Sequence, residues 1–185
     1  MAKQMISVST KTGDAGKTSL ANGQRLSKDH PVFGVIGELD ELNSWLGLIA
    51  AMFENQFEDH KRFLYVIQDT LFYIGAELAL SPKAKLKAEA LTLLEKHSEE
   101  LQKSMTEGWH TRFLLPGGTQ LGGFIDVART VCRRAERALV AYAVEEKVSP
   151  MLLKYVNRLS DYLYVLRCFV NHAVAYKEQE FRAQS

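Results

Sequence analysis

Apolar residues recur at helical spacing in five separate segments, and this periodicity constrains the fold more than any other feature of the chain. The predicted helices run from Pro31 to about Phe53, over about 57–80, from Ser81-Pro82 onward, over about 119–147 and over about 150–177. Their apolar stripes include Val35, Leu42, Leu46, Ile49, Leu64, Ile67, Leu71, Ile74, Leu78, Leu86, Leu93, Leu94, Leu101, Leu152, Leu159, Leu163, Leu166 and Val170. Because short loops join these helices, the sequence predicts an all-α fold, a five-helix antiparallel bundle.

Two helix starts carry recognisable first-turn signals. Pro31 is a favoured first-turn residue, with Asp29 or His30 as the expected cap. Ser149 precedes Pro150 in the same way. Outside the helices we expect a strand only at residues 5–9, and we divide the single predicted domain, 1–185, into an N-terminal loop segment, 1–29, and a bundle, 30–178.

The composition excludes several classes of protein. With 185 residues, 46% of them hydrophobic and 24% charged, the chain can bury the core of one globular domain. Its formal net charge of +1 argues against binding polyanions through bulk charge, and no nucleic-acid module is recognisable. No apolar run reaches the length of a membrane span, and Cys132 and Cys168 lack Cys-x-x-Cys spacing. These features predict a cytoplasmic protein with buried, reduced thiols and no membrane or nucleic-acid partner.

The stretch "STKTGDAGKTSL", residues 9–20, ends in the Gly-Lys-Thr of a Walker A loop. Lys11 stands where that motif requires its first glycine, and no apolar helical stripe follows. A Walker loop is therefore disfavoured. Glycines, hydroxyls and lysines in this order remain suited to wrapping an anion with backbone N–H groups, and the alternative is a flexible tail.

The predicted fourth helix carries a cluster of arginines. At about 100° per residue, Arg129, Arg133 and Glu136 fall within about 60° of one another, and Arg137 lies beside Arg133. Phe124, Val127, Val131, Ala135 and Ala138 are expected on the opposite side. Clustered guanidiniums suit bidentate phosphate contacts, although Asp126 and Glu136 would also pair with them on a solvated face. Arg134 lies off this line, where it would reach a neighbouring helix or subunit.

Two other helices carry polar residues opposite their leucines. On the fifth, these residues are Asn157, Asp161 and Tyr164, and on the first they are Asp40, Asn43, Ser44 and Gly47. Either set would bind a ligand or form a polar contact between helices. The loop at 107–119 places apolar residues in an exposed kind of segment. The five histidines show neither zinc spacing nor Glu-x-x-His pairs, so no metal is expected on protein side chains.

The motifs together resemble a known family. "TKTGDAGKTSL", "KDHPVFGVIGELDELNSWLG", "RFLLPGGTQL", "ARTVCRRAER" and "VNRLSDYLYVLR" stand in the order and approximate spacing of PduO-type ATP:cob(I)alamin adenosyltransferases, from about residue 9 to 170. The resemblance implies a homotrimer of five-helix bundles with sites between subunits. It also implies that the N-terminal loop folds over ATP without a Walker fold.

The resemblance implies a role for each matching residue. ATP would be bound by Thr10, Lys11, Thr12, Gly13, Asp14, Gly16, Lys28, Arg133, Arg134, Glu136, Arg137 and Asn157. Asp40 would pair with Arg129 across the subunit boundary and, with Phe113, would contribute to the cobalamin site. Phe113 would face the lower side of the corrin ring, and Arg133, Asp40, Arg129 and Phe113 would carry catalysis.

The implied reaction transfers the 5′-deoxyadenosyl group of ATP to cob(I)alamin, with Mg²⁺ accompanying ATP, cobalamin as substrate and triphosphate as product. A reductase and an acceptor enzyme dependent on adenosylcobalamin are the implied partners. The alternatives are a non-catalytic cobalamin carrier and an ATP-dependent phosphotransferase. Many bacterial members carry Arg and Tyr where this chain has Val32 and Ile36, and we interpret this departure as affecting affinity or packing.

Overall fold

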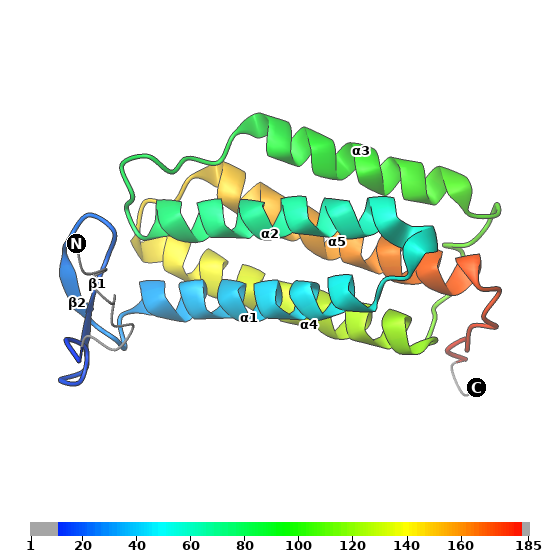
Figure 1. The fold of residues 1–185 in the computed structure, drawn as a ribbon, viewed down its shortest axis with the longest axis horizontal. Helices are drawn as coiled ribbons and strands as arrows, with labels where there is room; N and C mark the ends of the chain where they lie inside the picture. The colour runs from blue at the N-terminus through cyan, green and yellow to red at the C-terminus, as the bar shows by residue number, and fades with distance from the viewer. Residues whose placement is uncertain (1–10, 183–185) are drawn as a thin grey trace, which may run out of the picture.

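In the computed structural model, five long helices form one bundle with a small hairpin at one end (Figure 1). The model describes residues 11–182. The helices are α1 (Pro31–Met52), α2 (Glu58–Leu78), α3 (Ala88–Ser104), α4 (Gln120–Glu145) and α5 (Pro150–Ala173), with a 3-10 turn, η1 (Asn55–Phe57), before α2. The chain direction alternates from each helix to the next, which confirms the predicted antiparallel five-helix bundle (Figure 1).

Side-chain caps fix the starts of three helices. The His30 imidazole accepts a hydrogen bond from the Val32 amide, and Pro31 opens α1. Thr119 and Ser149 cap α4 and α5 by accepting bonds from the backbone amides of Gly122 and Met151. Such caps satisfy backbone donors that have no partner inside the helix, and those at His30 and Ser149 were predicted from the sequence, whereas the one at Thr119 was not.

The start of the third helix was predicted wrongly. It begins at Ala88 rather than at Ser81-Pro82. The Glu77 carboxylate at the end of α2 accepts a 2.7 Å hydrogen bond from the Leu86 amide. This bond holds the connecting segment as a loop, with Leu86 buried beneath it.

The N-terminal hairpin was missed. Strands β1 (Lys17–Ser19) and β2 (Arg25–Ser27) pair antiparallel, with Thr18 opposite Leu26. Gly23 has a φ of +88° in the connecting turn, a conformation that glycine adopts without strain. The dipeptide Asn22-Gly23 is a hairpin signal that the sequence reasoning did not use. The expected strand at residues 5–9 lies outside the described residues.

The core is the apolar side of all five helices. Helix α4 packs on α1 and α5, α2 packs on α1, and α3 packs on α5. The predicted stripes of α1, α2 and α5 are buried, but Leu93 of α3 is 39% exposed and Val127 of α4 is 38% exposed. Val32 is fully buried on α1, and the interpretation that the departures at Val32 and Ile36 affect affinity or packing stays a prediction. Among the described residues, none of the helices is long and apolar enough to cross a membrane.

Two histidines between α2, α3 and α5 make the stability depend on pH. His97 stacks on Phe63 with ring centroids 3.6 Å apart, and His60 meets Phe169 edge-on at 4.8 Å. Burial lowers the pKa of both imidazoles; it outweighs the nearby Asp59 and Glu100, which raise the pKa of His60 and His97 respectively, while Lys96 lowers that of His97 further.

The folded state therefore binds fewer protons than the unfolded state just below the ordinary histidine pKa of 6.5. We expect the free energy of unfolding to fall as the pH drops through that value, and to stop falling on this account below the folded-state pKa. Urea titrations across this range would measure the loss. The loss should be smaller in a double variant, His60→Leu with His97→Leu, and an equal loss would contradict this assignment.

Candidate active site

Arg129 and Arg133 of α4 line a cleft of about 400 Å³ whose other walls come from α3 and α5. Asp161 and Tyr164, two of the three α5 residues predicted to lie opposite its leucines, line the same cleft, whereas Asn157 does not. Burial raises the pKa of the Tyr164 hydroxyl, so this group stays a proton-bearing donor at neutral pH. The structure thus confirms the predicted common face of Arg129 and Arg133.

The rest of the predicted cluster lies one turn further along α4. The Arg137 guanidinium donates a 3.2 Å bond to the Arg133 carbonyl oxygen. The Asn157 amide nitrogen donates a 2.8 Å bond from α5 to the Glu136 carboxylate. Arg133 is exposed and makes no ion pair within the described part of the chain, so its guanidinium is available to an anion.

Arg134 points to another side of the helix. It forms ion pairs with Glu38 and Glu41 of α1. This agrees with the prediction that Arg134 reaches a neighbouring helix. Its contribution within one protomer is to tie α4 to α1, and a role with nucleotide stays a prediction.

Asp40 and Arg129 line different clefts of one protomer. Asp40 is exposed on α1 and lines a cleft of about 450 Å³ between α1 and α2, beside Phe33 and Ile36. Arg129 donates from Nε to the Asp126 carboxylate at 3.0 Å, the pairing that the sequence offered as an alternative. The predicted pair between Asp40 and Arg129 involves two copies of the chain and stays a prediction.

The N-terminal loop gathers several residues expected at ATP. Lys11 and Gly16 both have positive φ, and the Lys28 amide donates a 2.8 Å bond to the Gly16 carbonyl oxygen. A side chain on Gly13 would lie 3.2 Å from the Lys28 ammonium nitrogen, so Lys28 lies directly over the loop. Thr12, Asp14 and Gly13 complete the turn, whereas Thr10 lies outside the described residues.

The segment after this loop excludes a Walker fold. A Walker loop opens a helix whose first N–H groups contact phosphate. Here Lys17 and Thr18 begin strand β1 instead. The loop is therefore a separate turn ahead of a hairpin, which agrees with the prediction that a Walker loop is disfavoured.

Phe113 is 84% exposed in the loop between α3 and α4. The backbone of this loop pairs with the C-terminal segment: the Phe181 amide donates to the Phe113 carbonyl oxygen at 2.7 Å, and the Leu115 amide donates to Gln179 at 2.8 Å. An exposed phenylalanine on a loop whose backbone is bonded to the C-terminal segment offers an apolar contact to a ligand.

No group of three or more His, Cys, Asp or Glu side chains gathers as metal ligands anywhere in residues 11–182.

The family model for cobalamin adenosyltransferases matches residues 8–170. This chain belongs to the cobalamin adenosyltransferase family. The match includes the N-terminal loop, the Phe113 loop and the arginine helix.

Several adenosyltransferases are similar to it over most of its length. The corrinoid adenosyltransferase PduO of Salmonella typhimurium is 42% identical over 87% of this chain, although the chain spans only 48% of that relative. The cobalamin adenosyltransferase of Cupriavidus metallidurans is 37% identical over 94% of this chain and 92% of the relative.

A solved structure has the same fold. It is a variant PduO-type ATP:corrinoid adenosyltransferase from Lactobacillus reuteri complexed with cobalamin and ATP, which is 32% identical. It aligns with a TM-score of 0.89 over 96% of this chain and 100% of that one. A second variant of the enzyme, complexed with ATP, aligns with a TM-score of 0.86 at 34% identity.

In this adenosyltransferase, sequence reasoning missed one group of residues beside the site. Arg167 and Asn171 of α5 bond to the loop that carries Phe113, and Glu178 of the C-terminal segment accepts bonds from both of them. The sequence did carry an indication of this group, because Arg167 is four residues after Leu163 and so falls on the apolar stripe of α5. A charged residue at a core position needs buried partners.

Proposed function

We propose that this protein transfers the 5′-deoxyadenosyl group of ATP to cob(I)alamin, giving adenosylcobalamin and triphosphate. One observation carries the proposal: Arg129, Arg133 and Arg137 stand beside the Glu136–Asn157 contact on one face of α4. Membership of the adenosyltransferase family and the likeness to a complex with cobalamin and ATP support it.

The chemistry of the reaction explains why cations are needed. The Co(I) electron pair attacks C5′ of ATP, a Co–C bond forms, and the bond from C5′ to the phosphate oxygen breaks. The released electron pair stays on triphosphate, and cobalt becomes formally Co(III). Charge therefore develops on the polyphosphate, and fixed guanidiniums stabilise that charge more in the transition state than in bound ATP.

Each group of residues has a place in this scheme. Arg133 and Arg137 would hold the polyphosphate, with Lys28 and the turn at 11–16 covering it. Asn157 and Glu136, already bonded to each other, would contact the nucleoside. Mg²⁺ bound to ATP would neutralise further phosphate charge. Fixing C5′ in line with cobalt removes most of the entropic cost of the encounter.

Asp40 fits this scheme only if a second copy of the chain contributes to the site. Asp40 and Arg129 line different clefts of a protomer, so their pairing would join two subunits. We propose that sites form between subunits of a homotrimer in the cytoplasm. A reductase would supply the electron for cob(I)alamin, and an enzyme dependent on adenosylcobalamin would take the product.

The deciding assay combines the purified protein with Mg-ATP and chemically reduced cobalamin without oxygen. Formation of adenosylcobalamin together with triphosphate is the expected result. Release of ADP would instead identify a phosphotransferase, and bound but unaltered corrinoid would identify a carrier.

Phe113→Ala is expected to reduce the rate of the reaction with cobalamin while leaving the stability of the fold almost unchanged. Because Phe113 is 84% exposed, its loss should change the free energy of unfolding by no more than about 0.5 kcal/mol. An apolar group in place of the lower axial ligand lowers the cobalt acceptor orbital, so turnover that starts from cob(II)alamin with an added one-electron reductant should fall at least about tenfold, or ~1.4 kcal/mol.

Turnover that starts from cob(I)alamin is the internal control for this variant, since that cobalt is already reduced. It should fall less than turnover from cob(II)alamin. Equal losses in both assays would mean that Phe113 serves binding alone.

A further inference from the structure

Arg167 of α5 is only 1% exposed, yet its guanidinium has carboxylate partners on two other segments. Nε donates to Asp126 of α4 at 3.1 Å. Nη1 and Nη2 donate to the two Glu178 oxygens at 2.8 and 2.9 Å, a bidentate pair with the C-terminal segment. Nη2 also donates to the Leu115 carbonyl oxygen of the Phe113 loop at 2.9 Å. One side chain thus joins α4, the loop and the C-terminal segment to α5.

Asp126 extends this network to the arginine cleft. Its Oδ2 accepts bonds from Arg167 and from the Gly117 amide at 2.8 Å, while its Oδ1 accepts the bond from Arg129. Two arginines and two carboxylates balance in charge, which a buried cluster requires. The same carboxylate therefore contacts the loop that carries Phe113 and an arginine that lines the α4 cleft.

Asn171 of α5 also bonds to the loop that carries Phe113, at Gly117 and Thr119. This fully buried amide donates to the Gly117 carbonyl oxygen and to Glu178, and it accepts bonds from the amide and hydroxyl of Thr119. A side chain on Gly118 would lie 2.1 Å from its amide nitrogen. The loop therefore fits Asn171 only with glycine at that position.

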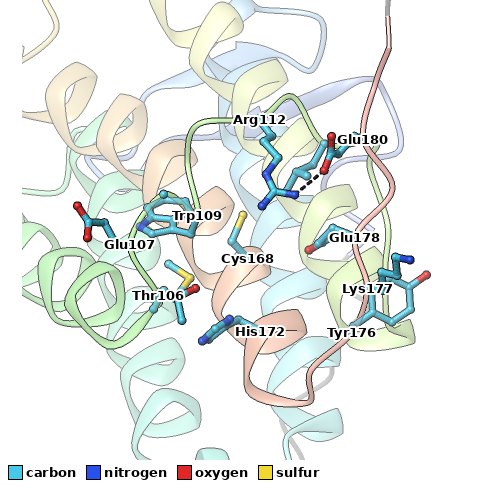
Figure 2. A pocket seen from close by; sticks show the side chains of 13 residues that line it. Thr106, Glu107, Trp109, Arg112, Cys168, His172, Tyr176, Lys177, Glu178 and Glu180 are labelled. Carbon is cyan, nitrogen blue, oxygen red and sulfur yellow. Dashed lines mark hydrogen bonds and ion pairs between the residues drawn. The ribbon is translucent and has the colours of Figure 1, made fainter.

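The exposed contact between the loop and the C-terminal segment is of a different kind. Figure 2 shows Arg112 and Glu180 joined at the edge of a cavity of about 320 Å³, with Glu178 nearby and Trp109 on the far side. Water screens such an exposed ion pair, so it contributes little. The buried bonds of the loop to Arg167, Asp126 and Asn171 are therefore expected to contribute more to its attachment than this ion pair does.

We propose that Arg167, acting through Glu178 and Asp126, is a positioning residue that sets the Phe113 loop relative to Arg129. The proposal rests on the function proposed above, in which Phe113 faces the corrin and Arg129 belongs to the same site. Loosening the network displaces Phe113 from the corrin while leaving Arg133 and the N-terminal loop in place. Cobalamin use should therefore suffer much more than ATP use.

Glu178→Gln tests the proposal, because it keeps the side chain's size and removes one charge of the cluster. The KM for cobalamin should rise roughly tenfold, whereas the KM for ATP should change less than about twofold. The electron paramagnetic resonance spectrum of cob(II)alamin bound with ATP should show more of the form that keeps its lower axial ligand. Amide hydrogen exchange at residues 113–118 should accelerate.

Glu180→Gln is the matched control, two residues along the same segment. It removes only the exposed partner of Arg112, so the two KM values, the spectrum and the exchange rates should stay within about twofold of the wild type. Equal effects of Glu178→Gln and Glu180→Gln, or equal losses for ATP and cobalamin, would overturn the proposal.

The two proposals fail in distinguishable ways. Absence of adenosylcobalamin with the wild-type protein would reject the proposed function. Unchanged exchange at residues 113–118 in Glu178→Gln would reject the positioning role, whether or not the wild type turns over.

Discussion

Replacing Arg133 with alanine is expected to lower kcat/KM for ATP by roughly 10²–10³, the usual cost of losing one preorganised group that stabilises charge in the transition state. Arg133 is exposed, lines the cleft on α4, and has no ion pair elsewhere in the described chain. The melting temperature should consequently change little. Steady-state kinetics of triphosphate release, beside a thermal melt, would measure both quantities.

Two further variants test how Arg133 acts: one separates the geometry of its side chain from its charge, and the other tests whether the effect is local to the cleft. Arg133→Lys keeps the charge but loses the planar fork that bonds two phosphate oxygens, so it should recover only part of the activity. Arg62→Ala removes an exposed arginine from α2, remote from the cleft in sequence and paired only within its own helix. If Arg62→Ala reduced activity as much as Arg133→Ala, a local role for Arg133 would be refuted.

Arg167→Met is expected to destabilise the protein by roughly 3–5 kcal/mol. The change leaves Asp126 with one cation fewer and Glu178 with no guanidinium, and both carboxylates lie in surroundings where water replaces the lost bonds poorly. At the usual sensitivity of a domain of this size, the melting temperature should fall by about 10 °C. Urea unfolding would give the free energy directly.

Arg158→Met is the matched control for Arg167→Met. Arg158 also lies on α5 and also pairs with two carboxylates, Glu95 and Asp161, but its side chain is 43% exposed. Exposed pairs contribute about 0–1 kcal/mol, so this variant should remain close to the wild type in stability. A similar loss in both variants would show that burial does not govern these ion pairs.

The fold was largely predictable because helical periodicity and capping are local in sequence. His30, Thr119 and Ser149 cap the helices within two or three residues of themselves. The two errors have different causes. A hydrogen bond from the Leu86 amide to the Glu77 carboxylate holds the segment before α3 as a loop, and no local pattern reveals it. The hairpin has strands too short to show alternation, and its local signal, Asn22-Gly23, was not used.

The site was predictable in its parts and not in its connections. The common face of Arg129 and Arg133 follows from the helical period, whereas the sequence left residues 11–16 open between an anion-binding loop and a flexible tail. The bonds that join Arg167 to Glu178 and Asp126 span 11 and 41 residues of sequence and leave no periodic signal. The proposed pairing of Asp40 with Arg129 would require a second copy of the chain, which periodicity cannot predict.

Pairing of the Phe113 loop with the C-terminal segment also sets the order of events during synthesis. Arg112 and Glu180 are 68 residues apart, and Phe181 pairs with Phe113. Domains begin to fold while the ribosome is still adding residues. Helices α1 to α4 are made before the segment that fixes this loop has emerged, so a nascent chain can hold most of its bundle while Phe113 is still unplaced. The apolar contact that we propose between Phe113 and the corrin would then be among the last features of the protein to form.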